Sequence, residues 1–317
     1  MMRHQRNSFV FVIPVRNPKD DKVTDYQCIE TALRETVRSL TSQTWKNTRV
    51  VIACHRIPDW SNHFGDKVTF LNVDHIPVFP PNTNPVRVDK GLKYVMGILY
   101  AYHVLNPALI MPMDADDYIN VTLAKSLIWR SRFSRGIDGY LVKKGLHVNL
   151  RITPEYAIKY EAAYQIKGFD QSCGSCRIFK AGSLVQKLKS IDPEIIERLS
   201  QWPTKAADAS ITVPAEPVMW LSDRSQSTYL TEDSMVNILG RHIRQKDYFK
   251  FSKLSSIGAA KGCGHGNHDG PRQGEIHQDK LIGEFPLPKF YRDFGIDPEA
   301  GPFQQRNMTS REIQAST

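Results

Sequence analysis

The stretch ALIMPMDADD, residues 108–117, joins a short apolar run to three carboxylates within four positions. An apolar run of this length, with Pro112 near its end, is typical of a buried strand rather than of a helix. Buried strands of open α/β sheets carry their ligand groups at their carboxyl ends. The stretch therefore predicts an α/β protein with a polar site directly after this strand.

The carboxylates of Asp114, Asp116 and Asp117 predict a cation site. Carboxylates this close repel one another unless a cation lies among them. Oxygen ligands suit Mg²⁺ or Mn²⁺, and such an ion often takes phosphate as a further ligand. The sequence thus indicates a metal that holds a diphosphate. An alternative is that Asp117 only starts a helix near Asn120, because Asp favours caps and turns.

The composition is that of a globular protein. The chain has 317 residues, of which 41% are hydrophobic and 24% charged, which fits one large or two small domains. Its net charge of +9 favours anionic partners such as nucleotides or acidic lipid. The cations are scattered and no nucleic-acid-reading signature is present, so no nucleic-acid partner is expected.

The longest apolar stretch, residues 94–105, is too short to cross a bilayer, and the N-terminus does not read as a secretory signal. A cytoplasmic location is therefore expected, and peripheral contact with the inner face of the membrane stays open. The five cysteines are an odd number, which argues against a disulfide framework.

Strand-like and helix-like patterns alternate in the first half of the chain. Residues 9–13, 49–54 and 68–73 are compact apolar runs that predict buried strands. Residues 28–43 and 89–105 have apolar side chains at helical spacing. This alternation predicts a parallel sheet flanked by helices. The pattern weakens after residue 143, and the last sixty residues, rich in Gly, Pro and His, predict loop or tail.

Three short motifs occur in a characteristic order. Pro14-Val15-Arg16-Asn17 follows the first strand, Ser39 to Gln43 ends the first helix, and Asp114-Ala115-Asp116-Asp117 follows the later strand. Together they resemble the inverting family 2 of the GT-A glycosyltransferases. The resemblance covers about residues 8–120. It returns at residues 174–179, which resemble the family's acceptor-side strand, and at Glu232-Asp233, which resemble the pair that heads its acceptor helix.

The resemblance implies a GT-A fold, with a Rossmann-like, mostly parallel sheet and a loop-rich C-terminal extension. It implies metal-dependent, inverting transfer by a hexosyltransferase-type enzyme. The donor is a nucleoside-diphosphate sugar, the acceptor is a saccharide or lipid-linked hydroxyl, and the cofactor is Mn²⁺ or Mg²⁺. The expected catalytic domain covers residues 1–250, with a nucleotide-sugar half at about 8–120 and an acceptor half at about 121–250. Residues 251–317 form the extension.

The resemblance also implies roles for single residues. Asp116 holds the metal, and Asp114 contacts the ribose, the metal or a metal-bound water. Asp233 is the base that removes the acceptor proton, although Asp233 is also a good helix start. The loop from Pro14 through Arg16 to Asn17 lies at the mouth of the first strand and meets the base and ribose.

Several further assignments have alternatives. Asp59 is the nearby candidate for an acid that binds uracil. Lys90 or Lys93 reaches phosphate, or both only form a solvated helix face. His265 or His268 completes the metal shell, or both lie in a tail without function. Cys173, Cys176, Cys263 and His265 form a zinc site, or the cysteines are ordinary buried thiols.

Two rival functions are distinguishable. A nucleotidyltransferase on a related sheet would have a glycine-rich loop after the first strand, whereas residues 14–19 contain no glycine. A sugar- or polyanion-binding module with a degenerate GT-A fold would bind without turnover. Nucleotide-sugar hydrolysis with and without Mn²⁺ separates such a module from an enzyme.

Overall fold

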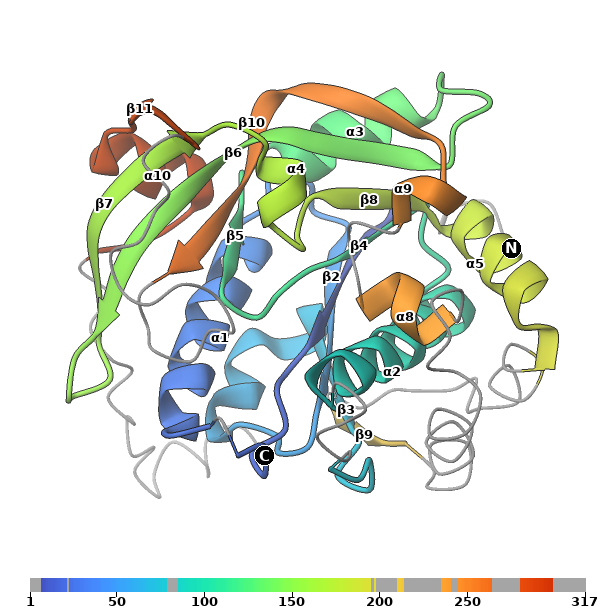
Figure 1. Cartoon of the computed structure of the whole chain (residues 1–317), viewed down its shortest axis with the longest axis horizontal. Helices are drawn as coiled ribbons and strands as arrows, with labels where there is room; N and C mark the ends of the chain where they lie inside the picture. The colour runs from blue at the N-terminus through green and yellow to red at the C-terminus, as the bar shows by residue number, and fades with distance from the viewer. Residues whose placement is uncertain are drawn as a thin grey trace, which may run out of the picture.

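The computed structural model describes residues 7–21, 23–78, 85–194, 197, 210–213, 235–240, 245–263 and 280–298. In these residues a central sheet of 11 strands has helices on both faces (Figure 1). The predicted α/β class with a large central sheet flanked by helices is therefore confirmed, but the sheet is mixed and not mostly parallel, because half of its strand pairs are antiparallel. The described helices include none that is long and apolar enough to cross a membrane.

The half of the sheet nearest the N-terminus is parallel. Its strands follow the spatial order β4-β1-β2-β3-β9, and each pairs in parallel with its neighbour. The bounds of these strands are β1 (Phe9–Pro14), β2 (Thr48–Cys54), β3 (Val68–Asn72), β4 (Leu109–Pro112) and β9 (Ser210–Thr212). The first four agree with the apolar runs of the sequence to within one residue at most ends. β9 lies in a stretch with two prolines that predicts irregular structure, yet it pairs with β3.

The other half is largely antiparallel. β8 pairs with β4 and β6, β6 pairs with β7, and β7 pairs with β11, all antiparallel. β10 lies off this order and pairs in parallel with β6 and antiparallel with β5. The bounds are β5 (Asp117–Ile119), β6 (Gly139–Ile152), β7 (Ile158–Ile166), β8 (Arg177–Lys180), β10 (Phe251–Cys263) and β11 (Leu281–Glu284).

β1 is buried on both faces because a helix covers each of them. Phe9, Phe11 and Ile13 belong to the same apolar cluster as α1 (Tyr26–Thr41). Val10 and Val12 belong to a second cluster with α2 (Pro85–Tyr100), which continues as a π-helical turn (Ala101–Leu105). α2 lies so close that a Cβ at Gly97 would be 2.4 Å from a methyl carbon of Val12.

Shorter helices complete the layers. α8 packs on α2, where a Cβ at Gly91 would lie 2.3 Å from the carbonyl oxygen of Val236 (Figure 1). The remaining helices of the described chain are η2 (Asp59–Lys67, a 3₁₀ helix), α3 (Leu123–Ser131), α4 (Phe169–Ser172), α5 (Ala181–Ile191), α8 (Met235–Gly240), α9 (Gln245–Tyr248) and α10 (Leu287–Phe294).

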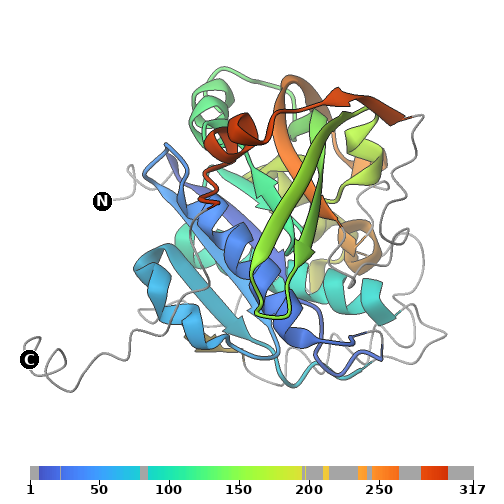
Figure 2. The ribbon, with the colours of Figure 1, turned by 90° about the vertical axis from the view of Figure 1, so that its left-hand side faces the viewer.

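The last sixty residues, expected to be loop or tail, contain regular structure in their described part, so that expectation is wrong there. β10 and β11 belong to the same sheet as β1, and α10 lies against it beside β7 (Figure 2). Phe290 and Phe294 of α10 are fully buried in a cluster with Tyr118. The composition of the segment did not indicate these buried residues, because it is dominated by Gly, Pro and His and because their partner Tyr118 is distant in sequence.

Candidate functional site

The predicted site residues of the first half gather at one edge of the sheet. β1 and β4 are parallel neighbours, with Val12 opposite Pro112. The segments that leave their carboxyl ends are therefore adjacent, and Met113 N–H donates to the Val12 carbonyl at 2.9 Å. Open α/β sheets bind ligands at this edge. Arg16, Asn17 and Asp114 thus follow adjacent strand ends.

Asp114 contacts side chains from α2 and from the segment before β8. Its backbone N–H donates to Ser175 Oγ at 2.8 Å, and Tyr94 Oη donates to Asp114 Oδ1 at 3.3 Å. Lys90 Nζ forms an ion pair with the same oxygen. A Cβ at Gly174 would lie 2.6 Å from Asp114 Oδ2, so only glycine fits there without a shift. α2 and the segment before β8 therefore fix this carboxylate jointly.

Lys90 stays charged in this position. Burial by itself would lower the pKa of the Lys90 ammonium, but Asp114, followed by Asp116 and Asp117, outweighs burial and raises it. Lys90 is thus one cation that balances the acidic corner, which we define as the carboxylates of Asp114, Asp116 and Asp117. The alternative in which Lys90 and Lys93 form a solvated helix face is wrong, since Lys93 is fully buried.

Asp116 belongs to a turn that is fixed from two directions. The carbonyl of the preceding residue, Ala115, accepts a hydrogen bond from Thr36 Oγ1 of α1 at 2.9 Å. The Asp116 carbonyl accepts one from Gly262 N–H of β10 at 3.2 Å, and a Cβ at Gly262 would lie 2.4 Å from that oxygen. The half-buried Asp116 side chain therefore projects from a backbone with little freedom.

Asp117 is a strand residue and not a helix cap. It is buried as the first residue of β5, and α3 begins six residues later with Thr122 as its N-cap. Cys173 Sγ donates to Asp117 Oδ2 at 3.2 Å, and Asp117 Oδ1 is buried without a hydrogen-bond partner. Burial, reinforced by Asp116 and Asp114, raises the pKa of Asp117 well above its ordinary value. The alternative that treats Asp117 as a simple helix start is wrong.

The loop after β1 is supported from below by a buried ion pair. Lys93 Nζ donates at 2.6 Å both to the Val15 carbonyl and to Asp89 Oδ2. Asn17 is buried, its Oδ1 accepts from Lys19 N–H at 2.9 Å, and its Nδ2 lies 2.9 Å from His55 Nε2. This network holds the backbone of the Pro14–Asn17 motif.

Arg16, on the same loop, pairs with Asp20 at 3.0 Å.

His55 predicts an acid-sensitive contribution to stability. Burial, and then the positive charge of Lys93, lower the pKa of His55 to about 3. In the unfolded chain histidine titrates near 6.5, so below that pH the unfolded state takes up a proton that the folded state does not. We expect His55 to make the free energy of unfolding fall by at most about 1.4 kcal/mol per pH unit between pH 6.5 and 4.

Urea denaturation of the wild type and of His55→Gln across this range checks the prediction, and the variant should show the shallower decline. His63→Gln, at an exposed histidine, serves as control and should decline like the wild type. Identical pH profiles for the wild type and His55→Gln would contradict the role of His55.

Asp59 has an electrostatic neighbour that the sequence did not predict. It is exposed at the start of η2, in the connection between β2 and β3. Burial raises the pKa of Glu30, Arg56 lowers it, and Asp59 adds to the rise. The charge of Asp59 therefore acts on Glu30, on α1, and a uracil-binding role for Asp59 stays a prediction.

The predicted residues of the second half mostly lie beyond what the structure describes. Asp233, His265 and His268 are outside the described residues. Within the described ranges, no group of three or more His, Cys, Asp or Glu side chains is arranged to hold a metal ion. The cysteines of the suggested zinc site are instead free thiols: Cys173 donates to Asp117, and Cys176 Sγ accepts from Arg177 Nη1 at 3.0 Å.

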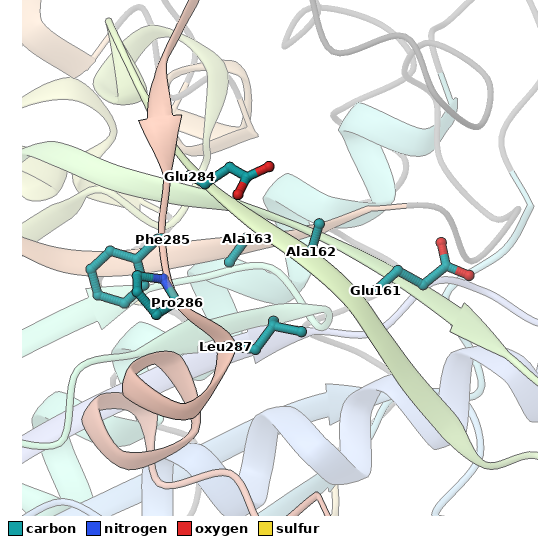
Figure 3. A pocket seen from close by; sticks show the side chains of 7 residues that line it. All are labelled: Glu161, Ala162, Ala163, Glu284, Phe285, Pro286 and Leu287. Atoms are coloured by element: carbon teal, nitrogen blue, oxygen red, sulfur yellow. The ribbon is translucent and has the colours of Figure 1, made fainter.

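A separate groove of about 420 Å³ lies between β7 and the segment that joins β11 to α10 (Figure 3). None of the predicted site residues lines it. Two glutamates and five apolar residues line it: Glu161, Ala162, Ala163, Glu284, Phe285, Pro286 and Leu287.

Sequence reasoning missed several residues that shape the acidic corner. Tyr94, Ser175 and Gly174 contact Asp114, and Lys261 Nζ donates to the Ser172 carbonyl at 3.3 Å while its charge acts on Asp117. The helical spacing of Lys90 and Tyr94 placed both on one face of α2, which was the available signal for Tyr94. Nothing local pointed to the others, because they come from segments more than fifty residues away.

No family model matches the chain, and no curated protein matches it in sequence. Among solved structures it is similar to Staphylococcus aureus TarS, with 15% identity and a TM-score of 0.38, over 81% of this chain and 37% of that chain. It is also similar to mannose-6-phosphate isomerase from Helicobacter pylori, with 12% identity and a TM-score of 0.38, over 78% of this chain and 98% of that chain. These likenesses assign the chain to no family; what stands is an α/β fold with an acidic corner at the carboxyl ends of β1 and β4.

Proposed function

We propose that this chain is an inverting glycosyltransferase that moves a sugar from a nucleoside diphosphate to an acceptor hydroxyl. The observation that carries the proposal is the position of Asp114 and Asp116 after β4, beside the Pro14–Asn17 loop after β1. Parallel sheets bind nucleotides in the crevice at this edge. The resemblance of the same residues to the motifs of family 2 enzymes supports this reading.

The described residues have distinct roles in this proposal. Arg16 and Asn17 contact the base and ribose, and Asp114 contacts the ribose or the cation. Lys90 lies within reach of Asp114 and supplies a positive charge to the diphosphate. Asp116 holds the cation. These roles place the cationic groups against the part of the donor that gains negative charge as the sugar leaves.

The carboxylates fit a divalent ion that arrives with the diphosphate. Carboxylate oxygens are the donors that Mn²⁺ and Mg²⁺ prefer, and such ions are often bound by one or two carboxylates plus substrate phosphate. Asp114 and Asp116 supply two carboxylates, and no group of three or more His, Cys, Asp or Glu side chains in the described residues is arranged to hold an ion. When bound, the ion would stabilise the charge of the leaving diphosphate as a Lewis acid.

Asp233 is the proposed base that accepts the proton of the acceptor hydroxyl. α8 begins two residues after Asp233 and packs on α2 at Gly91, the residue next to Lys90. α8 itself therefore lies beside the part of α2 that pairs with Asp114. The acceptor is a saccharide or a lipid-linked sugar in this proposal.

Lys90 couples the ion to the diphosphate. In the structure its ammonium pairs with Asp114 Oδ1, so an ion that uses this oxygen has to displace it. A bound diphosphate gives Lys90 another anion to pair with. We therefore expect ion and diphosphate to bind together more tightly than either binds alone, which is a coupling free energy between two ligands.

Thermal unfolding tests this expectation. A panel of nucleoside diphosphates is added with Mn²⁺, without Mn²⁺, and Mn²⁺ is added alone. At a concentration of 100 times Kd a ligand stabilises the native state by about 2.7 kcal/mol, which corresponds to roughly 5 °C in Tm for a chain of this size. We expect one diphosphate to reach this shift with Mn²⁺ and to produce a smaller one without it.

Lys90→Met is the informative variant, because the ion then does not have to displace an ammonium group from Asp114. Mn²⁺ alone should raise its Tm more than that of the wild type. A panel in which no diphosphate changes Tm, with or without Mn²⁺, would exclude a nucleotide site. Binding without any turnover of the matching nucleotide sugar would instead indicate a binding module.

A further inference from the structure

α3 and the loop after it expose two large aromatic side chains. One face of α3 is buried in the core through Leu123, Leu127 and Ile128. Trp129, near the end of the helix, is 51% exposed, and Phe133, in the loop, is 81% exposed. Phe133 is the most exposed large hydrophobic residue of the described chain. Rings this exposed are costly in water and commonly mark a contact surface.

The same segment is strongly basic. Four exposed cations lie between residues 122 and 138, and the acid among these residues is Asp138, whose carboxylate accepts from Lys250 N–H at 2.8 Å. The guanidinium of Arg132 lies 4.5 Å from the centre of the Trp129 ring. We define the aromatic–basic patch by its side chains: Lys125, Trp129, Arg130, Arg132, Phe133 and Arg135.

The patch lies at the sheet edge opposite to the acidic corner. Its loop leads into β6, and Lys180 N–H donates to the Asp138 carbonyl at 2.8 Å. Lys180 pairs with Leu109, the first residue of β4, whereas Asp114 follows the last residue of that strand. In Figure 1 the loop between α3 and β6 projects from the top of the molecule. A contact here leaves the carboxyl ends of β1 and β4 accessible.

Hydrogen bonds also hold the backbone of this loop against the sheet. Lys180 Nζ donates to the Ser134 carbonyl, and Tyr140 Oη donates to Ser134 Oγ at 3.0 Å. Asp138 N–H donates to the Lys250 carbonyl at 2.8 Å. β6 and β8 therefore anchor a loop that exposes the side chain of Phe133.

We propose that the aromatic–basic patch docks the protein on an anionic membrane surface. Trp and Phe rings are stable at the level of the lipid headgroups, where their apolar bodies leave water. Lysine and arginine next to them are attracted to anionic lipid, and each contributes to the affinity. Rings on a projecting, positively charged tip match this chemistry, since the tip enters a bilayer without needing a complementary groove. The proposal is independent of the proposed transferase activity.

Vesicle co-sedimentation of the full chain tests the proposal. Vesicles of phosphatidylcholine alone are compared with vesicles that contain 30% phosphatidylglycerol. We expect binding to the anionic vesicles that weakens with added salt, because exposed charges are screened. Arg130→Gln/Arg132→Gln/Arg135→Gln should weaken it about 100-fold, from roughly fivefold for each cation. Trp129→Ser/Phe133→Ser should weaken it at least about tenfold.

Matched controls distinguish binding through the aromatic–basic patch from nonspecific binding by other exposed hydrophobic or basic residues. Ile282→Ser removes another exposed hydrophobic residue, which is 60% exposed on β11, and Lys187→Gln/Lys189→Gln removes two exposed cations of α5. Both controls should bind anionic vesicles like the wild type. Circular dichroism and Tm of all variants show that the fold is kept.

A second measurement reports the position of Trp129 directly. Brominated phosphatidylglycerol quenches tryptophans that enter the bilayer, so vesicles with this lipid should quench the wild type more than Trp129→Phe. Failure of the wild type to bind anionic vesicles, equal binding to neutral vesicles, equal loss in the controls or equal quenching in Trp129→Phe would each overturn the proposal. Capture of RNA or of a protein in place of vesicles, with the same dependence on the patch, would also overturn it.

Discussion

Asp116→Asn is expected to reduce sugar transfer by a factor of about 1,000. Binding of a cation at a developing anionic oxygen contributes several kcal/mol to catalysis, and about 4 kcal/mol corresponds to three factors of ten in rate. Asparagine keeps the size of the side chain but loses its charge. The turn that carries Asp116 is fixed by backbone contacts with Thr36 and Gly262, so the substitution leaves the local fold in place.

The measurement is release of nucleoside diphosphate from the nucleotide sugar that the thermal panel identifies, with and without Mn²⁺. Asp66→Asn, at an exposed carboxylate of η2, is the control and should keep the wild-type rate. Retention of more than a tenth of the activity in Asp116→Asn would remove the main support for the proposed role. Unchanged Tm of the free variant excludes unfolding as the cause of the loss.

Lys93→Met is expected to lower the free energy of unfolding by about 3–5 kcal/mol, the usual cost of breaking a buried ion pair by removing one partner. Lys93 is fully buried, and it donates to the Val15 carbonyl and to Asp89. Burial raises the pKa of Asp89 and lowers that of Lys93, since an apolar environment disfavours both charges. Without Lys93, the Asp89 carboxylate would be buried with no opposite charge in contact.

The double variant Asp89→Asn/Lys93→Met removes both charges and should be less destabilised than Lys93→Met alone. Urea denaturation measures both, and Lys187→Met, on the exposed face of α5, is the control with no expected change. Equal stability of Lys93→Met and the wild type would show that the ion pair contributes nothing to folding. Because Lys93 also holds the Val15 carbonyl, Lys93→Met should bind nucleoside diphosphate more weakly than the wild type at temperatures where both are folded.

The sequence by itself determined strands β1 to β4 of the parallel half of the sheet and the edge at which the polar residues lie. β1, β2 and β3 are short, mostly apolar runs, and Leu33, Val37 and Leu40 of α1 recur at helical spacing. These signals are local, because a strand buried on both faces and an amphipathic helix each carry their environment in their own residues.

Only the tertiary structure decided which charged residues are buried or paired and where the C-terminal strand β10 lies in the sheet. The pairing of Lys90 with Asp114, the burial of Lys93 and the insertion of β10 between β5 and β6 each join residues that are far apart in the chain. A lysine at a helix start has the same sequence pattern whether it faces water or a carboxylate. Its state is set by the free energy of removing its charge from water against that of the partner it meets, and the fold supplies that partner.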